Sequence, residues 1–290
     1  MANSIAAAAA YLNGKLDAAY KAGAKSAALD INPAFVRQGD LAGTFYIPTL
    51  ALTGLGNVTA GVMPEGSVTQ TWVAHTYGYD RGRKLQVEVI DRDEGARVAA
   101  IANVAKEYMR VNVIPELDAI RFARIATAAD SAHKVQAALT TSSGAIAAVN
   151  AALVALSDDE ADMDNLLFFA TANVLNLIES AASTEAKCRI TNYTTPIEVP
   201  SSRFGTAVTC DAGSSDTAGG FTISGDALNF LLVDKGACFA DAKHQVERIF
   251  PAEINQAGDL DRFDYRIVHD AWVLSNRTTG VYAHSENTVS

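Results

Sequence analysis

The chain has 290 residues, of which 49% are hydrophobic and 19% charged, so it can build a packed interior, and wholesale disorder is excluded. The formal net charge of −10 argues against a dedicated nucleic-acid-binding protein, which would usually present a basic face, although a container for DNA needs no such face. The sequence contains no apolar run of the roughly 18 residues that a membrane span needs, and its three cysteines, Cys188, Cys210 and Cys238, match no zinc or redox spacing.

The first 93 residues predict two extended segments. Residues 1–43 are rich in Ala, Asn and Gly and have little apolar mass of their own, so they read as an arm that must lie on something else to be ordered. Residues 44–93 alternate as strands on either side of a glycine-rich tip. Because a lone hairpin is marginally stable in water, we expect residues 44–93 to form a projecting hairpin that packs on a neighbouring subunit.

Residues 94–129 have the strongest helical periodicity. Apolar residues such as Ile101, Ala105, Tyr108 and Ile120 recur at helical spacing, and they predict a helix from about Glu94 to Ala128 that covers a sheet. Pro115 lacks an N–H group and crowds the preceding turn, so we expect a kink or break just before it.

The remaining residues mix helices and strands without a regular βαβ order, which predicts an α+β fold. Residues 135–242 contain two helical patterns, a solvated acidic run from Asp158 to Asp164, and two buried strands at 166–170 and 229–233. Residues 243–290 read as strands and loops, with Phe263 to Val273 expected to lie under the long helix.

The sequence contains none of the common catalytic, nucleotide-binding or metal motifs. Its five histidines are scattered, and the acidic run lacks the glycine and the bidentate glutamate of a calcium loop. Asp91 to Glu94 are explained by the N-terminus of the long helix. We therefore expect no catalytic, cofactor-binding or metal-binding residues and predict that the protein is not an enzyme.

One charged segment remains open to two interpretations. The residues from Asp80 to Lys84 interrupt an alternating strand with an Asp-Arg-Gly-Arg-Lys run. Either they form a solvent-facing bulge, or they provide an ion-pair site between subunits.

The order of arm, hairpin, long helix, mixed domain and final strands resembles the HK97-like fold of major capsid proteins from tailed double-stranded DNA bacteriophages. The resemblance is carried by 80–83, 91–94, 113–123, 196–204, 247–251 and 263–270, in that order along nearly the whole chain. It implies an N-terminal arm at 1–43, an E-loop hairpin at 44–93, a peripheral-domain spine helix at 94–134, an axial domain at 135–242 and C-terminal strands of the peripheral domain at 243–290.

The resemblance also implies a mechanical function. Copies would form hexamers and pentamers of an icosahedral virion capsid, assembled in the host cytoplasm around packaged double-stranded DNA, without a membrane. A separate scaffolding protein and a portal are the implied partners. The alternative is an encapsulin-type nanocompartment of the same fold, which would enclose protein. Because residues 53–68 contain no lysine, we expect a shell without lysine-mediated cross-links at the hairpin tip.

Overall fold

The computed structural model describes residues 23–30, 37–38, 44–58, 63–89, 101–180, 189–214, 218–255 and 258–286. Most of the predicted arm, the predicted helix start with its acidic residues at 91–94, and Cys188 lie outside these ranges. The α-helices within the described ranges are α3 (Ile101–Tyr108), α4 (Ile114–Ala128), α5 (Ser142–Asp158) and α6 (Ala172–Glu179).

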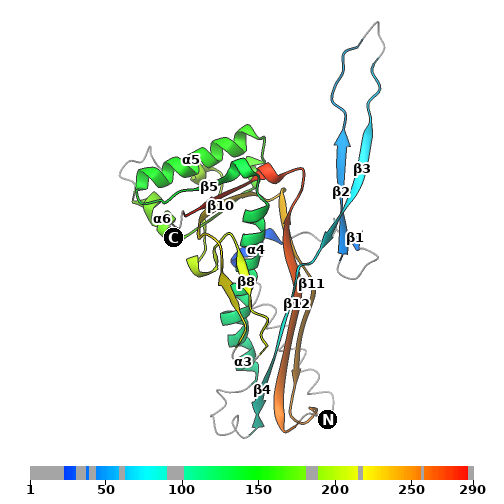
Figure 1. Cartoon of the computed structure of the whole chain (residues 1–290), viewed down its shortest axis with the longest axis vertical. Coiled ribbons are helices and arrows are strands. Elements are labelled where there is room, and N and C mark those ends of the chain that lie inside the picture. Colours follow the sequence, from blue (N-terminus) through cyan, green and yellow to red (C-terminus); the bar gives the residue numbers. More distant parts are fainter. Residues whose placement is uncertain are drawn as a thin grey trace.

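A five-stranded sheet with helices on both faces forms the thicker part of the molecule (Figure 1). Alternate residues of its central strand face opposite layers: Phe230 and Leu232 pack with α5 and α6, whereas Leu231 and Val233 pack with α4. Burial on both faces explains why this strand reads as a continuous apolar run. The strands run in the order β5 (Lys134–Gln136), β13 (Val281–Ser285), β10 (Leu228–Asp234), β6 (Leu166–Ala170), β7 (Ile197–Glu198).

A long three-stranded sheet forms the elongated part of the molecule, in the order β11 (Cys238–Phe250), β12 (Leu260–Val273), β4 (Tyr79–Glu88) (Figure 1). Phe263, Tyr265 and Ile267 of β12 lie buried against Ile101 and Ala105 of the long helix. The prediction that this helix covers the strand near 263–273 is therefore confirmed.

The long helix is interrupted by a π-helical turn at Met109–Val113, between α3 and α4. The N–H of Ile114 bonds to the carbonyl of Met109, five residues back, so the widened turn comes directly before Pro115. Pro115 then occupies the start of α4, where its missing N–H costs least. The expected interruption lies where the sequence placed it, but it is a widened turn and the helix continues through it.

Strands β2 (Thr44–Leu52) and β3 (Val68–Thr76) form a hairpin that projects away from both sheets, with β1 (Arg37–Gln38) paired to its base (Figure 1). The expectation that the hairpin extends to 93 is wrong for β4, which pairs with β12 along its whole length. Leu85 and Val87 explain the difference, because their alternating apolar side chains are covered by the chain's own helix.

The strand pairing near the C-terminus also differs from the expected grouping. Strand β13 pairs with β10 and β5, so it joins the helix-covered sheet, whereas 243–273 build the long sheet. The two remaining strands, β8 (Val208–Cys210) and β9 (Phe221–Ile223), precede β10 in the chain and form a small hairpin beside α4. Among the described residues, no helix has the length and apolarity needed to cross a bilayer.

Candidate intersubunit surfaces

The projecting hairpin has two chemically different faces. Directly opposed residues of antiparallel strands lie on the same face, and side chains alternate along each strand. The register pairs Pro48 with Trp72 and Leu52 with Val68 on one face, whereas it pairs Ala51 with Thr69 on the other. We call the first face the apolar face; it comprises Tyr46, Pro48, Leu50, Leu52, Val68, Gln70, Trp72 and Ala74.

The apolar face is largely open to solvent. The exposed fractions are 57% for Leu50, 66% for Leu52, 71% for Val68 and 43% for Trp72, and Leu55 at the tip is fully exposed. Large apolar side chains gathered on a single surface mark an interaction site in soluble proteins. The hairpin therefore presents an apolar surface whose described side chains are largely exposed in the single subunit.

The hairpin is also almost uncharged. Between 44 and 76, Glu65 is the one acidic residue, and there is no lysine or arginine. A surface without ion pairs to satisfy has little desolvation cost on contact with another apolar surface. Its composition therefore suits burial rather than long-range electrostatic steering.

An aromatic cluster anchors the base of the hairpin to the body. Phe45 is buried, and its ring centroid lies 4.8 Å from that of Trp272 and 6.0 Å from that of Phe239. His75 and Tyr77 complete the cluster from strand β3 and the residue after it. Burial lowers the pKa of His75 below its usual value. Such edge-to-face and stacked contacts fix ring positions as well as burying area.

The charged segment from Asp80 to Lys84 lies in the first half of β4 and forms no bulge. The β4–β12 register passes through it without a shift, so the first interpretation is wrong. Gly82 lies opposite Arg266, where an added Cβ would come within 2.7 Å of the Tyr265 carbonyl oxygen. The glycine is therefore needed for close strand packing.

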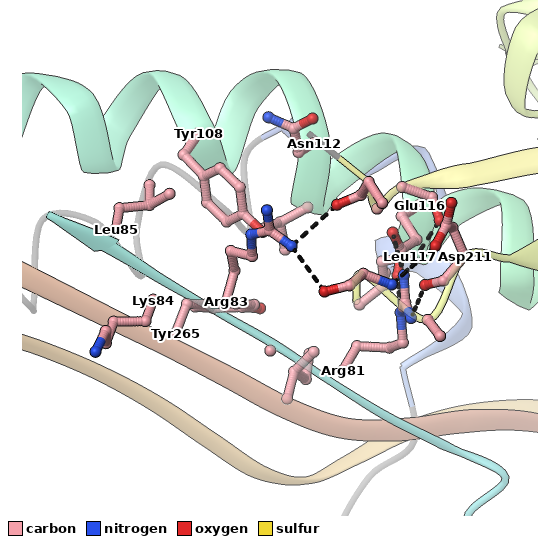
Figure 2. A pocket seen from close by; sticks show the side chains of 18 of the residues that line it. Arg81, Arg83, Lys84, Leu85, Tyr108, Asn112, Glu116, Leu117, Asp211 and Tyr265 are labelled. Atoms are coloured by element: carbon pink, nitrogen blue, oxygen red, sulfur yellow. Dashed lines mark hydrogen bonds and ion pairs between the residues drawn. The ribbon is translucent and has the colours of Figure 1, made fainter. Parts of the chain in front are cut away.

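Arg81 and Arg83 point to the same side of β4 and hold a loop of the chain (Figure 2). Arg81 donates from Nε to Glu116 Oε1 at 2.5 Å and from Nη1 to the carbonyl of Asp211 at 2.7 Å. Arg83 donates to the carbonyl of Ala218 at 3.0 Å and, more weakly, to that of Gly213. The described ion pairs of this segment, Arg81–Glu116 and Asp80–Arg266, are internal to the chain. The second interpretation, an ion-pair site between subunits, stays a prediction.

A cavity of about 830 Å³ lies between β4, the π-helical turn and the loop that the two arginines hold. Tyr108 and Asn112 line it from the helix (Figure 2). The hydrogen bond to the Glu116 carboxylate raises the pKa of the Arg81 guanidinium above its usual value. These cations bind backbone carbonyls and one carboxylate, an arrangement that fastens the loop to the helix and strand.

A buried carboxylate anchors the segment 23–30. The side chain of Asp118 is fully buried and accepts hydrogen bonds from the N–H groups of Lys25 and Ser26, each at 3.0 Å. Arg203 donates to the same carboxylate at 3.0 Å, and Arg121 pairs with Asp30 at 2.9 Å. The segment 23–30 is thereby tied to α4 and to the 3₁₀ turn at Ser201–Arg203.

The other titratable residues considered in the sequence lie apart in the structure. His133 pairs with Asp159 at 2.9 Å, while His284 contacts Asn229. The acidic run is exposed, and Asp162 accepts the N–H of Asp164 as a cap of the next 3₁₀ turn. Within the described ranges, no group of three or more His, Cys, Asp or Glu side chains is placed to hold a metal.

The sequence reasoning missed three carboxylates that hold other segments: Asp118 and Asp270, which are buried, and Asp241, which is partly buried. Only Asp118 had a usable signal, because it lies among apolar residues of a helix between Leu117 and Ile120. Asp241 and Asp270 accept hydrogen bonds from Tyr77 and Gly78, which lie 164 and 192 positions away, and no local pattern reveals such contacts.

Comparison with known proteins gives structural matches over most of the chain. No protein-family model and no curated protein sequence matches it. The mature capsid of bacteriophage PhiM1 superposes with a TM-score of 0.61 at 13% identity, covering 87% of this chain and 84% of that one. The structure from Mycobacterium phage Cain has a TM-score of 0.57 at 12% identity and 92% coverage of both chains.

A further match comes from outside the phages. A virus-like particle from Pyrococcus furiosus superposes with a TM-score of 0.52 at 9% identity, covering 94% of this chain and 98% of that one. The described part of the chain therefore has the overall fold of these proteins. The chain has the α+β, HK97-like fold of tailed-phage capsid proteins.

Proposed function

We propose that this protein is a non-enzymatic major capsid protein that assembles through its projecting hairpin into the hexamers and pentamers of an icosahedral phage head. The observation that carries the proposal is the exposed apolar face of β2–β3 on a chain with a capsid fold. A large exposed apolar surface of this kind marks an interaction site, and in a shell a second copy is always adjacent.

The proposed shell is a virion capsid assembled in the host cytoplasm around packaged double-stranded DNA. The acidic balance of the chain, −10 in all, fits a container that holds DNA without binding it tightly. A separate scaffolding protein and a portal are the proposed partners. Individually modest contacts repeated around the shell add up through avidity.

A second candidate is a nanocompartment that encloses protein, because the match to the Pyrococcus particle covers nearly the whole of both chains. We favour the phage head because the PhiM1 capsid has the higher TM-score, 0.61 against 0.52. The content of particles from the native source separates the two functions. Double-stranded DNA supports a phage head, whereas a discrete co-purifying enzyme supports a nanocompartment.

Assembly is tested by electron microscopy of the purified full chain, with two hairpin variants that differ in the face they alter. Leu50→Asp places a charge on the apolar face, and Thr69→Asp places the same charge on the opposite face at an exposed position. We expect closed shells from the wild-type chain and from Thr69→Asp, and their loss in Leu50→Asp. Equal assembly by the two variants would contradict docking through the apolar face.

The absence of lysine from 53–68 further predicts that mature shells are held without covalent cross-links at the hairpin tip. Boiled, reduced particles should migrate as a single 30.5 kDa chain on a denaturing gel. A ladder of multiples under those conditions would contradict the prediction.

A further inference from the structure

The hairpin is joined to the body by a link of only two residues on one side. Strand β3 ends at Thr76 and β4 begins at Tyr79, so Tyr77 and Gly78 alone connect them. One strand belongs to the projecting hairpin and the other to the long sheet. The backbone of this link therefore sets the direction in which the hairpin leaves the body, as short hinge segments do in other proteins.

A buried carboxylate holds the second residue of the link. Asp270 is completely buried, and its Oδ2 accepts the N–H of Gly78 at 2.9 Å. Arg124 of α4 donates to both oxygens of the same carboxylate, at 2.9 and 3.0 Å. A bidentate arginine fixes a carboxylate in orientation as well as in position. The Asp270 side chain thus links the Gly78 backbone to Arg124 and fixes its position relative to the long helix.

A second carboxylate holds the first residue of the link. The Tyr77 hydroxyl donates to Asp241 Oδ2 at 2.5 Å, and burial, together with this hydrogen bond, raises the pKa of Tyr77. Asp241 and Asp270 are direct cross-strand partners on β11 and β12. Like charges placed opposite each other destabilise a sheet. This acid pair does not stabilise the sheet, so its contacts with Tyr77 and Gly78 explain it better.

The space around the link leaves little room for another backbone path. An added Cβ at Gly78 would come within 2.8 Å of Asp270 Oδ2 and 3.8 Å of Arg124 Nη2. The Tyr77 ring packs edge-on against Trp272, with 5.2 Å between centroids. The link is consequently held through a hydroxyl, an amide and a ring at once.

We propose that Asp241 and Asp270 form a clamp on the Tyr77–Gly78 link that sets the angle of the hairpin, and through it the curvature at which one copy meets the next. The inference rests on the proposed function, because the angle matters only if the hairpin docks on another copy. Both acids are positioning residues that act through the link. Loosening the clamp leaves the apolar face intact and changes where it points.

Distances between spin labels on the unassembled full-length chain test the clamp without depending on assembly. One label is placed at Thr69 on the hairpin and one at Arg248 on the long sheet, both exposed, with the three cysteines replaced by alanine. The variants are Tyr77→Phe, which removes one hydroxyl, and Asp270→Asn, which removes the charge. The control is Asp264→Asn, which alters an acid of β12 that pairs with Arg262 and lies outside the clamp.

We expect a broader or shifted distance distribution in both clamp variants and the wild-type distribution in the control. In electron micrographs, the clamp variants should form shells with a wider spread of diameters. Wild-type distributions in both clamp variants would overturn the inference, whatever the shells look like. Failure of the wild-type chain to form closed shells would instead overturn the proposed function, so the two failures are distinct.

Discussion

The hairpin β2–β3 and the long sheet β11–β12–β4 are both antiparallel ladders with alternating side chains, but only one of them is covered by its own subunit. Phe263 in the long sheet is fully buried under the long helix, whereas Leu52 and Val68 in the hairpin are 66% and 71% exposed. The pattern of a strand thus indicates that one face will be buried, but not which element buries it. In the hairpin, we propose that the covering element is another copy of the chain.

The largest expected effect of a substitution lies in the covered sheet. Phe263→Ala should lower the free energy of unfolding of the unassembled chain by about 3–5 kcal/mol, because it leaves a cavity in a core that cannot fully collapse. Denaturant unfolding measures the loss, and Gln86→Ala, on the outer face of β4, is the control. A loss below about 1 kcal/mol would mean that the helix does not cover this face in solution.

Acid should also weaken the covered sheet through one buried histidine. Burial lowers the pKa of His269 to about 3, with Arg121 and Arg81 adding repulsion. In the unfolded chain the pKa is about 6.5, so between these values the unfolded state binds a proton that the folded state does not. The stability conferred by the neutral ring is present above about pH 6.5 and is lost as the pH falls.

The His269→Phe variant should remove this contribution, so its stability should fall less between pH 7 and pH 4, by on the order of 3 kcal/mol. Denaturant midpoints at each pH, compared with those of the wild-type chain, give the difference. Parallel pH curves for the two chains would show that His269 does not govern this part of the acid response.

The smallest effect on the isolated subunit is expected in the hairpin. Leu52→Ser should change the free energy of unfolding of the unassembled chain by less than about 0.5 kcal/mol, because the side chain is already in water. The same unfolding assay applies. A loss above about 2 kcal/mol would place this side chain in the subunit's own core and remove the contrast between the two ladders.

Local patterns in the sequence predicted the elements whose partners are dictated by periodicity or by continuous burial. The strands at 166–170 and 229–233 correspond to β6 and β10, and the long helix covers the strand near Phe263. The interruption before Pro115 was also predictable, since the missing N–H is a property of that residue alone.

Long-range pairing could not be predicted in the same way. Strand β4 pairs with β12, whose residues are more than 170 positions further along the chain, and its alternation suits the hairpin equally well. Arg81 and Arg83 bind backbone carbonyls of a loop, and carbonyls have no side-chain signature in a sequence. The contacts of Asp241 and Asp270 with the Tyr77–Gly78 link could not be predicted either, because they join residues 164 and 192 positions apart.

Acrylamide quenching of tryptophan fluorescence, before and after assembly, tests the central claim most directly. The chain has two tryptophans: Trp72 on the apolar face is 43% exposed, and Trp272 in the aromatic cluster is 9% exposed. The Trp272→Phe variant isolates the signal of Trp72, and Trp72→Phe serves as the matched control. We predict that Trp72 is readily quenched in the unassembled chain and becomes protected in closed shells, while Trp272 is protected in both. Closed shells in which Trp72 is quenched as strongly as in the free subunit would contradict docking of the apolar face on a neighbouring copy.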